Sequence, residues 1–218
     1  MPLHDSEAIV LRTYALGDAD RLVSLLTRDH GRLRGVAQGA RRTKSRFGAA
    51  LEPFTYLRVW FYERETRDLV RIRQCEILES FLDLQQDYRS GLALALAAEI
   101  TDAVLPEREP QDAAFRLLLH VLRGLRQGCR PELALGYFLV WTIRLAGWLP
   151  DLDHPRMAAL SRDSLAAARR ILAAPLGDLA ADANSPRVTP EFEAYFLDML
   201  EHHMERRLAS RRLYEETR

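Results

Sequence analysis

Cysteine and long apolar runs are scarce in this chain of 218 residues. The two cysteines, Cys75 and Cys129, are too few and too scattered for a disulfide framework, so we expect the protein in a reducing compartment of the cell. We interpret each cysteine as a small buried apolar residue. No stretch reaches the roughly 18 uninterrupted apolar residues of a membrane span, and the first residues lack the charged and apolar regions of a signal peptide. We therefore expect a cytoplasmic globular protein without a membrane partner.

Catalytic and nucleotide-binding motifs are also missing. The sequence contains no Gly-x-x-x-x-Gly-Lys-Ser/Thr, Gly-x-Gly-x-x-Gly, His-Glu-x-x-His or Gly-x-Ser-x-Gly segment. The rings of the adjacent His202 and His203 would diverge by about 100° on a helix, which disfavours a shared metal site. Asp151 and Asp153 fit a polar connection between helices better than a catalytic carboxylate pair. These observations predict that the protein is not an enzyme.

Positive charge is concentrated in one stretch of the chain. The whole sequence has 31 basic and 31 acidic residues, yet residues 28–46 contain seven basic residues and a single acid, Asp29. Glycines at positions 31, 35, 39 and 48 disfavour a long helix there, so we expect these cations on a strand and a flexible loop. Residues 1–80 have 14 basic and 11 acidic residues, whereas residues 81–218 have 17 and 20. This difference in sign favours a nucleic-acid surface on the first part.

The basic stretch has two interpretations. A run of charge is often only a solvated loop. Aromatic residues follow this one, however, and cations interleaved with aromatics are typical of a groove in which bases stack. Some of the same aromatics should fill a core, since alternate residues of a strand face inward. The aromatic residues that follow the basic stretch are Phe47, Phe54, Tyr56, Trp60, Phe61 and Tyr62.

The first 80 residues predict five short strands, at 7–14, 21–27, 32–38, 54–62 and 69–78, with a charged turn at 63–68. Five short antiparallel strands hide their edges best in a small closed barrel, so we predict an OB-fold, with an SH3-like barrel as the competing topology. From Asp83 onward the apolar residues recur at spacings of three and four, which is typical of helices. The predicted fold is therefore α+β in two domains, with an OB-fold β-barrel over 1–80 and an all-α domain over 81–218.

Five helices are expected in the second part, at 86–105, 111–127, 131–146, 161–174 and 189–213. The third is apolar nearly all round, which places it at the centre of a bundle. The last begins with Thr189 as N-cap and Pro190 at N1, and its second half carries Arg206, Arg207, Arg211 and Arg212. These cations either complement the helix dipole or form a second anion-contact face.

Several segments together resemble the bacterial RecO DNA repair family. They follow the family's order over nearly the whole chain: AIVLR at 8–12, DRLV at 20–23, HGR at 30–32, GARRTKSR at 39–46, LEPF at 51–54, GWLPDL at 147–152 and RR at 211–212. The resemblance implies an OB-fold joined to a helical domain. It also implies binding of single- and double-stranded DNA, annealing of complementary strands, and cooperation with RecR and the single-strand-binding protein SSB to load RecA at gaps.

The resemblance also implies particular contacts. DNA contacts of the family lie on the basic OB face and map here to Arg34, Arg41, Arg42, Lys44 and Arg46, and the helical domain is expected to receive the acidic, apolar-ended SSB tail. The C-terminal cations Arg206, Arg207 and Arg211 complete the candidate DNA-binding set. We expect the protein in the cytoplasm, at the nucleoid. A protein adaptor that uses barrel and bundle only for protein contacts is the alternative function.

One segment departs from the family pattern. Many members carry a four-cysteine zinc module directly after the Leu-Pro-Asp-Leu-Asp segment, but here residues 153–156 read Asp-His-Pro-Arg and lead into a helix without cysteine. One histidine cannot replace four thiolate ligands. We therefore predict no structural zinc and no other cofactor.

Overall fold

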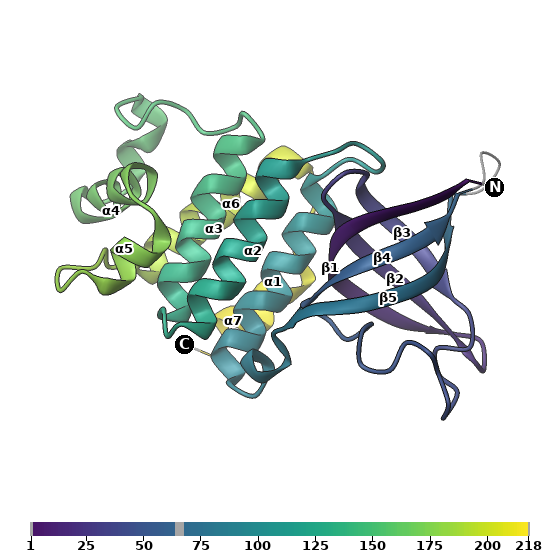
Figure 1. Cartoon of the computed structure of the whole chain (residues 1–218). Coiled ribbons are helices and arrows are strands. Elements are labelled where there is room, and N and C mark those ends of the chain that lie inside the picture. Colours follow the sequence, from purple (N-terminus) through teal and green to yellow (C-terminus); the bar gives the residue numbers. More distant parts are fainter. Residues whose placement is uncertain (1, 64–67, 218) are drawn as a thin grey trace. The chain divides into compact units, whose positions relative to one another are not determined.

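The computed structural model describes residues 2–63 and 68–217. The chain forms two compact units, one made of residues 1–86 and 101–115, the other of residues 87–100 and 116–218. Their helices and strands are labelled in Figure 1. Residues 64–67 of the predicted charged turn lie outside the described residues. The domain boundary placed at residue 80 rests on the change of period and stays a prediction.

Five strands of the first unit close into a barrel. They are β1 (Leu3–Leu16), β2 (Asp20–Thr27), β3 (Gly31–Ala37), β4 (Thr55–Tyr62) and β5 (Val70–Ser80). Their order around the barrel is β1-β2-β3-β5-β4, and β4 pairs back with β1. All neighbours are antiparallel except β3 and β5. This topology is that of an OB-fold, so the predicted fold is confirmed and the SH3-like alternative is wrong.

Strand β1 is longer than predicted and serves two neighbours. Its first part, from Leu3 to Ile9, pairs with β4, and the part from Ala8 to Leu16 pairs with β2. A register shift between Val10 and Arg12 lets the strand bend from one partner to the other. The sequence did not predict the part of β1 before residue 7, because the polar residues there do not alternate with apolar ones.

The barrel core takes several residues from the segment between β3 and β4. Ala40, Phe47, Ala50 and Leu51 lie in the same buried cluster as the inward residues of the strands. Backbone hydrogen bonds of turn type recur along this segment, such as Arg42 N–H to the Gly39 carbonyl at 3.1 Å. Where the sequence predicted a flexible loop, the structure has a series of turns anchored in the core.

The remaining chain is helical. The elements are the 3₁₀ turns η1 (Leu82–Gln85) and η2 (Pro155–Ala159) and the helices α1 (Tyr88–Val104), α2 (Asp112–Arg126), α3 (Pro131–Leu145), α4 (Arg162–Ala173), α5 (Leu176–Ala181), α6 (Pro190–Met204) and α7 (Ala209–Glu215). Helix α3 is buried along most of its length and packs against α4, α5 and α6. Its predicted central position is confirmed. The short α5 was not predicted.

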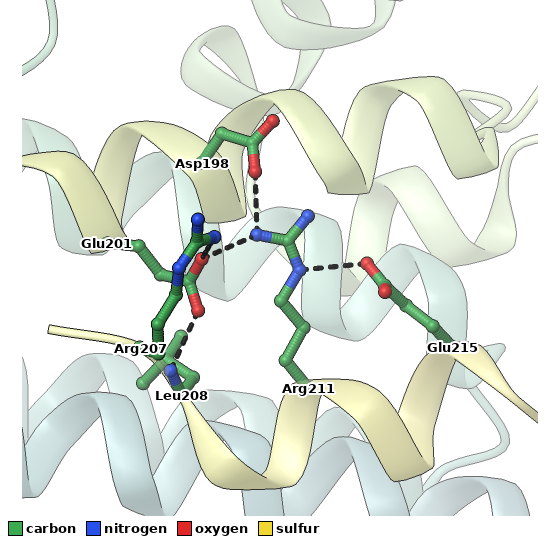
Figure 2. A network of polar contacts seen from close by, with 6 residues as sticks. All are labelled: Asp198, Glu201, Arg207, Leu208, Arg211 and Glu215. Atoms are coloured by element: carbon green, nitrogen blue, oxygen red, sulfur yellow. Dashed lines mark hydrogen bonds and ion pairs between the residues drawn. The ribbon is translucent and has the colours of Figure 1, made fainter.

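The single helix predicted over 189–213 is wrong, because the chain breaks into α6 and α7. Thr189 caps α6 as predicted, its hydroxyl accepting the Phe192 N–H, but Glu205 adopts a left-handed conformation with φ of 50° and ends the helix. The Glu201 carboxylate then accepts the Leu208 N–H at 2.7 Å (Figure 2). The carboxylate of Glu99, on α1, accepts two further N–H groups at the start of α7. Acids outside α7 thus satisfy its first amides.

None of the helices in the described part of the chain is both long enough and apolar enough to cross a membrane.

Candidate nucleic-acid interface

The predicted DNA-binding residues of the loop lie on one anchored segment, residues 38–54, which we call the basic loop. Arg41, Arg42, Lys44 and Arg46 are exposed, whereas Phe47 behind them is buried. Turns alternate outward cations with inward apolar anchors, so the positive charges are held on the surface. The base of the loop is also tied to the turn between β1 and β2.

That tie involves both backbone and side chain. The Arg41 N–H donates to the Ala19 carbonyl at 2.9 Å, and the Arg41 guanidinium donates to the Gly17 carbonyl at 2.7 Å. The Gly39 N–H donates to the Asp20 carboxylate at 2.8 Å. Carbonyl partners leave the charge of Arg41 uncompensated, so the whole loop stays electropositive.

The cations of the described barrel residues, Arg12 apart, fall into two groups. One group is neutralised by acids: Arg21 pairs with Glu52 at 2.9 Å, Arg28 with Glu7 and Asp112, Arg32 with Asp102 and Glu107, and Arg58 with Asp5 at 3.5 Å. The other group has no carboxylate within ion-pair distance in residues 2–63 and 68–217, and it comprises Arg34, Arg41, Arg42, Lys44, Arg46, Arg71 and Arg73. The second group contains every barrel residue predicted to bind DNA. It also contains two arginines that sequence analysis missed.

The two missed arginines line a groove on the barrel wall. This groove, which we call the β5 groove, has a volume of about 670 Å³ and is lined by Arg46, Tyr62, Arg71, Arg73, Gln74 and Cys75. Arg46 joins it to the basic loop, since its Nε donates to the Arg73 carbonyl at 2.8 Å. Alternation of arginine with valine and isoleucine over residues 70–73 was the signal for this outer row of cations.

The aromatic residues divide between core and surface. Phe47, Phe54, Tyr56 and Phe61 are buried, so they are core residues. Trp60 and Tyr62 are half-buried on the outer side of β4, where alternate residues point away from the core. In the set considered from the sequence, these two can therefore offer a ring to a ligand.

The C-terminal cations lie in a network of ion pairs (Figure 2). Arg211, only 14% exposed, contacts Asp198 at 2.6 Å and both Glu201 and Glu215 at 2.8 Å. Arg207 is 88% exposed and contacts Glu201 at 2.8 Å, while Arg206 is 3.9 Å from Glu99. Arg211 thus serves the packing of α7 against α6. Arg206 and Arg207 remain accessible from solvent.

No cluster of three or more histidine, cysteine, aspartate or glutamate side chains suited to a metal ion occurs in the described part of the chain. The absence of structural zinc stays a prediction.

Comparison with known proteins gives matches over most of the chain. Residues 1–81 match the family model described as Recombination protein O N terminal, and residues 85–156 match Recombination protein O C terminal. A DNA repair protein RecO of Koribacter versatilis (strain Ellin345) is 49% identical over 152 residues, which are 70% of this chain and 62% of that protein.

Two further relatives have the same name. The DNA repair protein RecO of Cutibacterium acnes is 41% identical over 159 residues, or 70% of this chain and 64% of that protein. That of Bifidobacterium adolescentis is 37% identical over 204 residues, or 92% of this chain and 80% of the relative. The chain thus spans less than two thirds of the length of the first two relatives.

Proposed function

The chain belongs to the recombination protein O (RecO) family, and from this premise we propose that it binds single- and double-stranded DNA through its barrel, anneals complementary strands and, with RecR and SSB, promotes loading of RecA at gaps. We assign this work to the cytoplasm, at the nucleoid. The observation that carries the proposal is the basic loop, which holds four exposed cations with no carboxylate partner in residues 2–63 and 68–217.

The mechanism needs no covalent step. Cations that neutralise phosphates release counterions, so affinity should fall steeply with salt and depend little on sequence. Two complementary strands held on one positive surface repel each other less and meet at a higher effective concentration. Annealing can then proceed without ATP, and the protein acts as a mediator and makes or breaks no bond.

The first prediction tests the basic loop. Replacing Arg41, Arg42, Lys44 and Arg46 together by alanine should lower duplex affinity about 100-fold at low salt and reduce the slope of log affinity against log salt by about 3 to 4, because each lost phosphate contact removes about 0.9 from that slope. Fluorescence anisotropy with labelled oligonucleotides over a salt series measures both quantities. Strand annealing, followed by energy transfer between two labelled strands, should slow in parallel.

A matched control removes the same total charge elsewhere. The exposed arginines for it are Arg58, Arg123, Arg162 and Arg187. This control should bind nearly as well as the natural chain. Equal binding by the loop variant and the natural chain would refute the role of the loop, and failure of the natural chain to bind any oligonucleotide at low salt would favour the adaptor function.

We assign the SSB tail to a pocket of the second unit. Its volume is about 660 Å³, and its lining comprises Arg144, Leu149, Pro150, Asp151, Leu152, Asp153, Arg169 and Leu172. Arg169 is paired with Asp153, whereas Arg144 is exposed and lies over the Trp141 ring, 5.5 Å from its centroid. Apolar side chains beside an accessible guanidinium suit an acidic tail with an apolar end.

The second prediction concerns this pocket. Arg144→Glu should weaken a synthetic acidic peptide with an apolar end by about 10-fold or more, because a like charge replaces an attractive one. Isothermal titration calorimetry gives the affinity, and Arg162→Glu, an exposed arginine at the start of α4, is the control. Identical peptide affinities for the two variants would place the tail elsewhere. DNA binding should be unchanged in both.

A further inference from the structure

The β5 groove exists because the pairing of β3 with β5 is short. Only residues 35–37 of β3 pair with residues 70–72 of β5, so β5 leaves β3 after Ile72. The next residue, Arg73, is an extra residue in the β4–β5 ladder, since Phe61 pairs with Ile72 and Trp60 pairs with Gln74. A bulge of this kind bends a strand and redirects its side chains. Here it leaves Arg73 and Gln74 both exposed and returns Cys75 toward the core.

The charges in the groove are all positive. Arg46, Arg71 and Arg73 line it, and no carboxylate belongs to its lining in the described part of the chain. Burial raises the pKa of Cys75 to about 12, and the opposing influence of Arg46 does not reverse this, so the thiol is neutral at pH 7. Three guanidinium groups in one groove repel one another, and an anion that enters relieves this repulsion.

The groove also presents an aromatic ring. Tyr62 is half-buried, and its hydroxyl accepts a hydrogen bond from Arg73 at 3.0 Å, which links the ring to the cations of the groove. The Arg73 guanidinium lies 5.9 Å from the ring centroid. An aromatic face beside cations suits a base that is not paired, since a duplex keeps its bases stacked inside and offers mainly phosphates to such a wall.

We propose that the β5 groove is a subsite for single-stranded nucleic acid, in which Arg46, Arg71 and Arg73 bind phosphates and Tyr62 stacks on a base. The inference rests on the proposed DNA binding. It adds a second binding site for a nucleic-acid strand beside the basic loop, and Arg46 belongs to both sites. One strand in the groove and a second strand or duplex on the loop would lie on the same unit. Two strands held on the same unit are close enough to pair, which would promote annealing.

The test uses an oligothymidylate of about 16 nucleotides, the upper end of OB-fold site sizes, an abasic oligonucleotide of equal length and a duplex. Arg71→Gln with Arg73→Gln should weaken the oligothymidylate about 10-fold and lower its salt slope by about 1.4, or 0.7 for each lost contact on a single strand. Tyr62→Leu should weaken the oligothymidylate about fivefold, by loss of stacking, and leave the abasic strand unaffected. Circular dichroism confirms that the variants are folded.

The control is Arg58→Gln with Arg187→Gln, which removes two exposed charges outside the groove. Groove and control variants should bind the duplex equally. A groove variant that binds the oligothymidylate as the control does would overturn the subsite, as would equal losses of Tyr62→Leu on abasic and thymidine strands. If the natural chain binds no nucleic acid, the proposed function itself fails.

Discussion

Gly31→Ala is expected to destabilise the barrel unit by about 3 kcal/mol, the sum of a left-handed backbone penalty and the cost of overpacking. Gly31 has φ of +66°, and a Cβ there would lie 2.0 Å from the Glu109 carbonyl oxygen. The clash is with backbone, so no side-chain rotation relieves it. The segment cannot move away freely either, because the Arg108 N–H donates to the Arg32 carbonyl at 3.0 Å. Urea unfolding of the variant measures the loss.

Gly17→Ala separates the two causes. Gly17 has a similar φ of +58°, and a Cβ there would meet nothing within 4 Å. It should therefore cost only the backbone penalty, about 1 kcal/mol. Equal losses at the two positions would show that the segment around Glu109 does not lie against β3.

The barrel could be predicted because its strands are separated by turns rich in glycine and aspartate, which are recognisable in the local sequence. The register in which the strands pair could not be predicted, and the β5 groove depends on that register. A single extra residue, Arg73, decides which side chains face outward. The consecutive polar residues Arg73 and Gln74 interrupt the alternation, but this interruption alone does not say which residue is the extra one. By contrast, the outward side of Trp60 and Tyr62 was available from the sequence. Both lie two or four residues after Arg58 on β4 and therefore on the same face of the strand, and an arginine is rarely buried in a core.

The break between α6 and α7 had no local signal. Residues 205–208 contain neither glycine nor proline, and the periodicity continues through them. The decisive acids are Glu201, seven residues before Leu208, and Glu99, 110 residues before Ala209. A tertiary interaction therefore overrides helical propensity here, which single-sequence reasoning cannot foresee. The same network changes the interpretation of the C-terminal arginines.

Arg211→Met should destabilise the second unit by about 3 kcal/mol, because it leaves the Glu201 carboxylate, whose side chain is 6% exposed, without one of its two cationic partners. The control lies on the same helix: Arg212 is 84% exposed and, among the described residues, pairs only with Glu216 four residues on, so Arg212→Met should leave the free energy of unfolding nearly unchanged. Urea unfolding gives both values.

DNA binding decides what the stability loss means. If Arg211 serves packing alone, the folded fraction of Arg211→Met binds oligonucleotides as tightly as the natural chain, whereas the loop variant keeps its stability and loses affinity. If Arg211→Met instead keeps its stability and loses affinity, the guanidinium leaves its three acids to contact DNA, and the C-terminal cations form a second binding face. Opposite responses of the loop variant and of Arg211→Met would show that the barrel binds DNA and that Arg211 stabilises the packing of α7.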